Sequence, residues 1–269
     1  MRTRAEVIAT LEAKRHLAKA IPEVSLPTTP KGRTSDLLVL CDLPSVFAEL
    51  PQLARRAAKS NVALVIFSLN KADMAQLADA FAFAARLNVT PFFAPDFATC
   101  RRMIVAREHN AIDKLIACAS IRGSELVAWS CEPKQYIVRF GALPGVRDLS
   151  GIAQQKFTLD ADGSRLHWPH GDIALDLDAI RYACDSVFRR QTDRIARERL
   201  RHYGKAIRAL RKKHRLTQGD ISGLTDRQLR RLEAGLVVPH TSSMEKLAAA
   251  HRMSLPDYLS ALAELSRSP

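Results

Sequence analysis

Residues 216–235 run LTQGDISGLTDRQLRRLEAG, and this stretch decides how the last third of the chain folds. Thr217 and Thr225 each stand where a helix N-cap is expected, since Ser, Thr, Asp and Asn favour that position. The spacing predicts a short helix over 218–222 and another over 226–233, each followed by a glycine that can end it. Two short helices joined by a tight turn are therefore expected here.

Further helices are expected on both sides of this pair. Residues 205–213 precede it with apolar side chains at helical spacing, and residues 242–250 and 257–265 follow it, each near a proline. The segment 204–266 is therefore predicted to be an all-α bundle.

This pattern resembles the helix-turn-helix of the Xre/Cro-type repressor family over about residues 204–265. The matching residues are Leu216-Thr217-Gln218, Leu229 through Glu233, Gly235, Pro239 and Glu245-Lys246-Leu247-Ala248. The resemblance implies that helix 226–233 enters the major groove of DNA. Between Gln218 and Glu233 the chain is about three residues shorter than the family spacing, a loss that can tilt the recognition helix.

The outward face of the recognition helix carries side chains suited to DNA. Helical spacing turns Leu229 and Leu232 inward and leaves five polar side chains outside, namely Asp226, Arg227, Gln228, Arg230 and Arg231. Arginine can bond bidentately to guanine, and glutamine to adenine. Phosphate contacts are expected from three further residues, Gln218, Thr241 and Ser242, at the starts of their helices. Glu233 is expected to be structural, and the competing interpretation is that these arginines form only a solvated face.

The positive charge of the chain is concentrated near its end. The sequence holds 41 Lys and Arg against 28 Asp and Glu, a net charge of +13. Residues 181–215 alone hold thirteen basic and three acidic side chains, which attract polyanions. We expect the helical connector 184–203 to contact phosphates through Arg197 and Arg201. The alternative is that these charges serve only solubility.

The first part of the chain has the pattern of a small α/β domain with a parallel sheet. After a predicted helix over 3–19 and a Pro-rich linker, which together fill 1–35, short apolar runs alternate with helical stretches through 36–118. The apolar runs are 37–41, 62–68 and 89–94, and the helical stretches are 45–59, 71–87 and 96–108.

Residues 122–183 are predicted to form a small antiparallel domain. Its strands are expected at 125–130, 136–140, 156–159 and 165–168, with a helix over 177–188. The run from Asp160 to Asp172, DADGSRLHWPHGD, followed by Asp176-Leu177-Asp178, is similar to a small bacterial domain family of unknown function. The whole chain is thus predicted to be an α+β multidomain protein: α/β, then antiparallel, then an all-α helix-turn-helix bundle.

Several functional classes have little support. The five cysteines lie far apart without a Cys-x-x-Cys pair, and no run approaches the roughly 18 apolar residues of a membrane span. A metal on His167 and His170, with Asp172 and Asp176 nearby, is disfavoured because His-x-x-His on a strand and turn has poor geometry. Cys100 with His109 lacks an orienting group, and the α/β region lacks a glycine-rich phosphate loop. We expect no catalytic residue, metal or cofactor, although a ligand can still sit at Asp42, Ser68, Asn70 and Asp96.

These patterns predict a non-enzymatic, sequence-specific DNA-binding transcriptional regulator, a repressor by analogy. Its expected partner is double-stranded DNA; it is expected to be a cytoplasmic, nucleoid-associated homodimer without membrane contact. Residues 36–183 would dimerise, sense a small effector or dock a protein. The alternatives are an antitoxin-like or defence-associated interaction protein that regulates its own expression, and an enzyme on the α/β domain, using Asp42 or Asp96, tethered to DNA.

Overall fold

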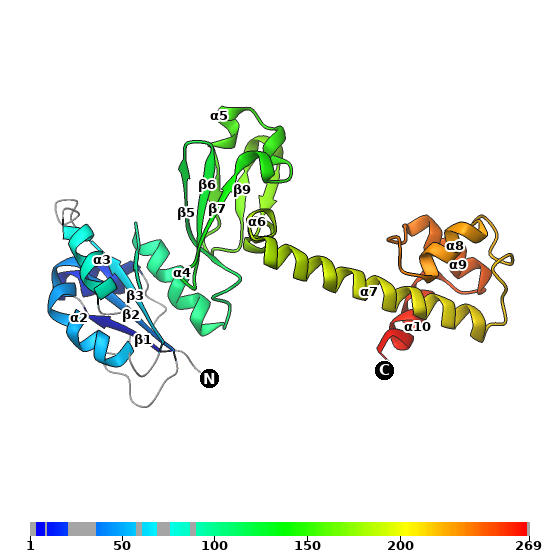
Figure 1. Ribbon diagram of the computed structural model, residues 1–269, viewed down its shortest axis with the longest axis horizontal. Coiled ribbons are helices and arrows are strands. Elements are labelled where there is room, and N and C mark those ends of the chain that lie inside the picture. Colours follow the sequence, from blue (N-terminus) through cyan, green and yellow to red (C-terminus); the bar gives the residue numbers. More distant parts are fainter. Residues whose placement is uncertain are drawn as a thin grey trace. The chain divides into compact units, whose positions relative to one another are not determined.

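The computed structural model describes residues 4–8, 10–20, 36–57, 61–68, 76–86 and 90–267. The chain divides into two compact units, Met1–Asp185 and Ser186–Pro269, and each is described by itself. The first unit contains a parallel sheet and two antiparallel sheets, and the second contains helices (Figure 1). The predicted mixed fold class, with these three kinds of structure in this order along the chain, is confirmed.

The parallel sheet has four strands whose spatial order follows the sequence. They are β1 (Arg4–Ile8), β2 (Asp36–Asp42), β3 (Asn61–Phe67) and β4 (Thr90–Phe93). The helices of this part are α1 (Leu11–Ala20), α2 (Leu43–Ala57), α3 (Leu77–Arg86) and α4 (Phe97–Glu108).

Both faces of this sheet are buried, which explains why its strands are continuous apolar runs. On β3, Leu64 is buried in the same cluster as Ala84 of α3. Its neighbours Val65 and Phe67 are buried in another cluster, with Met103 of α4. Because side chains alternate along a strand, these two sets belong to opposite faces of the sheet.

The first residues of the chain differ from the prediction. A helix was expected over 3–19, but residues 4–8 form strand β1, which pairs with β2 with Val7 opposite Leu40. The helix of this region begins only at Leu11. Val7 and Ile8 are β-branched, and a short apolar run fits the helical and the strand period equally well. Pairing with β2 therefore makes this segment a strand. The expected linker 21–35 lies outside the described residues.

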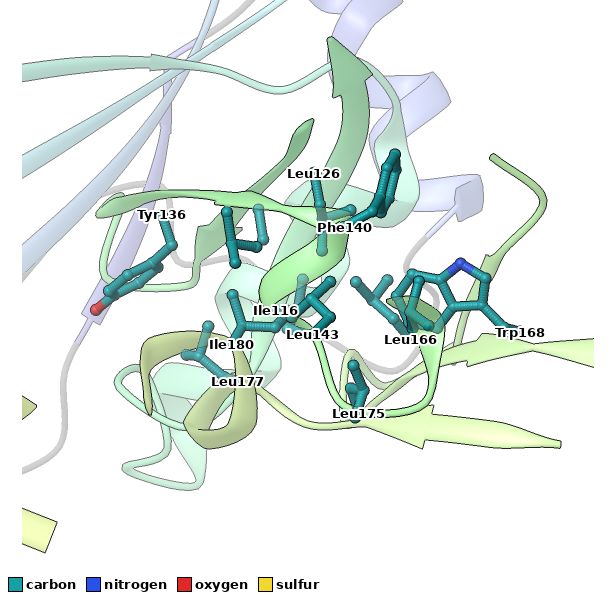
Figure 2. Close-up of a cluster of buried hydrophobic side chains, with 13 residues drawn as sticks. Ile116, Leu126, Tyr136, Phe140, Leu143, Leu166, Trp168, Leu175, Leu177 and Ile180 are labelled. Carbon is teal, nitrogen blue, oxygen red and sulfur yellow. The ribbon is translucent and has the colours of Figure 1, made fainter. Parts of the chain in front are cut away.

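Two three-stranded antiparallel sheets complete the first unit. One contains β5 (Ile116–Arg122), β6 (Glu125–Ser130) and β7 (Gln135–Arg139), and the other β8 (Thr158–Leu159), β9 (Leu166–Trp168) and β10 (Ile173–Leu175). Helices α5 (Gly151–Gln154) and α6 (Leu177–Cys184) accompany them. Figure 2 shows apolar side chains of both sheets and of α6 gathered around Leu143 and Leu166, which are both fully buried. Strands β5 and β10 were not predicted, because small Ala, Cys and Ser residues weaken the alternation in β5, and β10 has only three residues.

Helix α4 joins the parallel sheet to the antiparallel part. Its buried Arg102 donates from Nε to the carbonyl of Ala117 at 2.6 Å, and buried Arg107 donates from Nη1 to the carbonyl of Cys131 at 2.9 Å. Ala117 and Cys131 also share the hydrophobic cluster that contains residues of α4. The segments 36–118 and 122–183, expected as separate domains, therefore belong to one compact unit.

The second unit has four helices within its described residues: α7 (Ser186–Lys213), α8 (Asp226–Glu233), α9 (Thr241–Ala250) and α10 (Leu255–Arg267). The expected connector 184–203 and helix 205–213 form the single 28-residue helix α7. The helix expected over 177–188 is interrupted instead at Asp185, whose backbone is extended. Each of the four helices contributes a fully buried side chain to one core, namely Ile207, Leu229, Leu247 and Leu262.

Candidate nucleic-acid interface

Helix α8 is fixed at its start by a reciprocal capping box. The Thr225 hydroxyl accepts a hydrogen bond from the Gln228 amide N–H at 3.2 Å. The Gln228 side-chain oxygen accepts in return from the Thr225 amide at 2.9 Å. Two orphan amides are thereby satisfied, which explains why the helix begins at Asp226, as predicted.

A buried ion pair fixes the other end of α8. Glu233, 8% exposed, accepts from Arg211 of α7 at 2.5 Å (Nε to Oε1) and 3.1 Å (Nη2 to Oε2). This hydrogen bonding raises the pKa of Arg211. Arg211 also donates to the carbonyl of Leu216 at 2.7 Å, so one guanidinium holds α7, the following turn and α8 together. The sequence predicted a structural role for Glu233. It did not indicate that Arg211, one of several basic residues at the end of α7, is the partner of Glu233.

Two glycines let the backbones of α7 and α8 approach closely. A Cβ atom at Gly204 would lie 2.6 Å from the carbonyl oxygen of Leu232. A Cβ at Gly235, where φ is +64°, would lie 2.5 Å from the Cα of Arg201. No side chain fits at these distances, so the end of α8 is seated on the middle of α7 beside Arg201.

The prediction of a helix over 218–222 is wrong, because this segment forms turns and bends. The Asp220 carboxylate accepts from the Thr217 amide at 2.6 Å and from its hydroxyl at 2.7 Å, which lowers the pKa of Asp220. Gly219 lies within this turn and Gly223 follows it, and glycine disfavours helix. Ile221 alone anchors the segment in the core, with 1% of its surface exposed.

The outward face of α8 is exposed over all five predicted residues, Asp226, Arg227, Gln228, Arg230 and Arg231. Behind them, Leu229 is fully buried and Leu232 is 5% exposed. Arg230 is exposed and donates from Nε to the carbonyl of Asp226 at 3.3 Å. The result is a short, well-anchored helix with three arginines on its free side.

Two predicted contact residues, Gln228 and Gln218, are hydrogen-bonded within the protein. The oxygen of Gln228 accepts from the Thr225 amide and, at 3.1 Å, from the Thr225 hydroxyl, so only its NH2 group remains for another partner. Gln218, half-buried, donates from Nε2 to Glu233 at 3.3 Å. Hydrogen-bond choices of this kind cannot be deduced from helical spacing.

The remaining predicted contacts lie on α9 and α7. Thr241 and Ser242 are exposed in the first turn of α9, and Lys246 in the same helix donates to the carbonyl of Gly223 at 2.9 Å. Arg197 and Arg201 are exposed on α7, where Arg197 donates from Nε to the carbonyl of Asp193 at 3.2 Å.

Two apolar residues directly after α8 were not singled out. Leu236 and Val238 are each 67% exposed, next to the basic face. Their signal in the sequence is three successive apolar residues, Leu236-Val237-Val238, in a loop.

The segment from Asp160 to Asp178, singled out in the sequence, serves the fold. The Trp168 side chain is fully buried and donates from Nε1 to the carbonyl of Gln154 at 2.9 Å. Gly163 has φ +81°, and a Cβ there would lie 2.4 Å from the carbonyl oxygen of Ile116. Asp176 accepts from the Ala179 amide at 2.8 Å and caps α6.

Neither the metal site at His167 and His170 nor the Cys100–His109 pair considered in the sequence is assembled. His167 and Asp172 lie 3.5 Å apart at the surface, and in the described part of the chain no three His, Cys, Asp or Glu side chains are placed to hold a metal. Cys100 is fully buried, and burial raises the pKa of its thiol to about 12, which keeps it protonated and unreactive. Asn70 lies outside the described residues.

Comparison with known proteins gives no relative. No family model, no curated protein and no solved structure matches this chain. Among the helices that the structure describes, none is long and apolar enough to cross a membrane.

Proposed function

We propose that the second unit binds double-stranded DNA with the outward face of α8 in the major groove, and that the protein is a sequence-specific transcriptional regulator, expected to be a repressor. The observation that carries the proposal is the contrast between the two sides of α8. One side is locked by Leu229, Leu232 and the Arg211–Glu233 pair, while Arg227, Arg230 and Arg231 are exposed on the other. A groove reader needs such a rigid helix with long donors on its free side.

The two sets of arginines have different roles in this proposal. Arg227 and Arg231 lie one turn apart on α8 and would bond to base edges, since arginine matches the two acceptors of guanine. Arg197 and Arg201 on α7, with Thr241 and Ser242 on α9, would contact phosphates and set the orientation. Gln218 and Gln228 already have partners within the protein, so we assign neither a direct contact.

A homodimer on a two-fold operator fits the size of the unit, because one short helix reaches only a few base pairs. The first unit would then provide the dimer contact or the sensing function.

The proposal is tested by replacing one arginine from each set. Duplexes bound by the full chain are first selected from genomic fragments, and affinities of Arg227→Ala and Arg197→Ala are then measured on the best duplex and on single-base variants. Arg227→Ala should lose roughly 1–3 kcal/mol on the best duplex and become indifferent to the base at one position. Arg197→Ala should weaken every duplex by a similar factor and reduce the dependence on salt.

Arg165→Ala, an exposed arginine of the first unit, is the control and should leave binding unchanged. Equal losses for Arg227→Ala and Arg197→Ala on every duplex would show that α8 does not read bases. Failure of the intact chain to bind any duplex at moderate salt would end the proposal altogether.

A further inference from the structure

The first unit contains a cavity of about 460 Å³ at the carboxyl ends of β3 and β4. This volume lies within the range of small-molecule sites, and the carboxyl edge of a parallel sheet is where α/β folds bind ligands. The residues that the argument uses are Glu12 and His16 of α1, Phe67 and Ser68 at the end of β3, and Asp96 and Phe97 at the start of α4.

The charged side chains that line the cavity argue against a phosphate ligand, although phosphates often bind at this edge of an α/β sheet. Phosphates need basic side chains or a glycine-rich loop, and none of the described lining residues is a lysine or arginine. The ionisable groups are instead the carboxylates of Glu12 and Asp96 and the imidazole of His16. In a protein with a net charge of +13, a cavity lined by carboxylates selects a cation.

Asp96 keeps acceptor capacity although it caps α4. Its Oδ1 accepts from the Thr99 amide and hydroxyl, both at 2.7 Å. Arg102 lies 3.9 Å from the same oxygen, and its guanidinium is already bonded to the carbonyl of Ala117. A carboxylate has about four lone-pair sites, so Asp96 can accept from a further donor.

A third carboxylate lies at the same edge of the sheet. Asp42 is the last residue of β2, opposite Phe67 in the register, and it is only 2% exposed. Its Oδ2 accepts from the amide of Thr10 at 2.9 Å, while its Oδ1 has no hydrogen-bond partner among the residues that the structure describes. A buried oxygen of this kind is costly without a donor, and it adds to the negative field at the edge.

Apolar surface accompanies these charges. The rings of Phe67 and Phe97 lie with their centroids 5.7 Å apart and their planes inclined at 58°. Phe97 is half-buried, so it offers surface to a carbon chain, and an aromatic face also attracts a cation.

We propose that this cavity binds a small organic cation of the alkylammonium class. The ammonium group is held by Glu12 and Asp96, and the carbon chain lies against Phe67 and Phe97. This site lies in the first unit, and its existence does not depend on DNA binding by the second.

Three probes of equal chain length test the proposal by calorimetry on the full chain: diaminobutane, butanediol and succinate. The first carries ammonium groups, the second is neutral and the third is anionic. Diaminobutane should bind saturably with a Kd of about 1 mM or tighter, and the other two should not bind. Binding of succinate, or no saturation by diaminobutane in this range, would overturn the proposal.

Two variants locate the site. Glu12→Gln and Asp96→Asn should each weaken diaminobutane binding by about tenfold or more, since each removes one charge-assisted hydrogen bond. Asparagine still accepts from Thr99 and still favours the N-cap, so α4 is kept. Glu108→Gln, an exposed carboxylate at the far end of α4, is the matched control and should leave binding unchanged. Equal affinities for Glu12→Gln, Asp96→Asn and Glu108→Gln would show that the cation binds elsewhere.

Discussion

At the scale of single residues, the core of the second unit contains a histidine that it keeps neutral. His251 is 5% exposed, its Nδ1 lies 2.7 Å from the carbonyl oxygen of Leu247, and its Nε2 has no hydrogen-bond partner in the described part of the chain. The rings of His214 and Tyr258 lie about it, with centroids at 5.1 and 5.0 Å. Burial lowers the pKa of His251, and the nearby His214 and Arg211 lower it further, against the opposing effect of the Leu247 carbonyl.

A lowered pKa makes the second unit sensitive to acid. The unfolded chain binds a proton at His251 with the ordinary pKa of 6.5, and the folded chain binds it only at lower pH. The stabilisation is therefore complete above pH 6.5 and is lost as pH falls through and below that value. Hydrogen exchange in α9 and α10 should accelerate over this range relative to the trend of other amides.

His251→Asn is the variant that checks this, because asparagine can still donate to Leu247 but does not titrate. Its exchange in α9 and α10 should depend less on pH than that of the natural chain. The surface histidine variant His170→Asn serves as control. A pH dependence of exchange that survives His251→Asn would show that another group causes it.

At the scale of elements, the stability of α8 depends strongly on its capping box, because the helix has only eight residues. Short helices are marginal in water, and its only fully buried side chain is Leu229. Thr225→Ala removes the hydroxyl that accepts from Gln228 and should cost about 1 kcal/mol. It should increase hydrogen exchange in the first turn of α8 and, if α8 reads DNA, weaken binding to the selected duplex.

Ser222→Ala changes an exposed hydroxyl in the turn just before and is the control. Identical exchange in Thr225→Ala and Ser222→Ala would mean that packing alone, without the cap, holds the helix.

The contrast between α8 and its neighbours shows what local signals can predict. Thr225 and the glycine at 235 define α8 from both ends, so its bounds were predicted correctly. Residues 218–222 carry a similar N-cap signal, yet Thr217 bonds to Asp220 within one turn and no helix follows. The local pattern of β1 predicts a helix, because its partner β2 lies about thirty residues away, beyond the reach of such a pattern.

The candidate interface was predictable to a similar extent. The exposed positions of α8 follow from helical spacing, and the arginines among them are exposed as expected. The inward bonds of Gln218 and Gln228 depend on Glu233 and Thr225, which compete with any external partner. Such competition is settled by three-dimensional geometry, which spacing along the chain does not contain.

At the scale of the whole molecule, each unit has its own hydrophobic core. The cluster around Ile207, Leu229 and Leu247 lies entirely in the second unit, and the other three clusters lie in the first. Domains with separate cores can unfold separately, so two transitions are expected on heating the full chain. Both tryptophans, Trp129 and Trp168, belong to the first unit, and their fluorescence therefore follows that unit alone.

Glu233→Gln separates the two transitions. It removes one charge from the buried pair and leaves Arg211 uncompensated, a change that costs about 3 kcal/mol or more. The loss of helical circular dichroism that belongs to the second unit should then shift to lower temperature, while the tryptophan transition stays in place. A tryptophan transition that falls together with the helical one would mean that the two cores are energetically coupled, and that a ligand held by one unit can change the stability of the other.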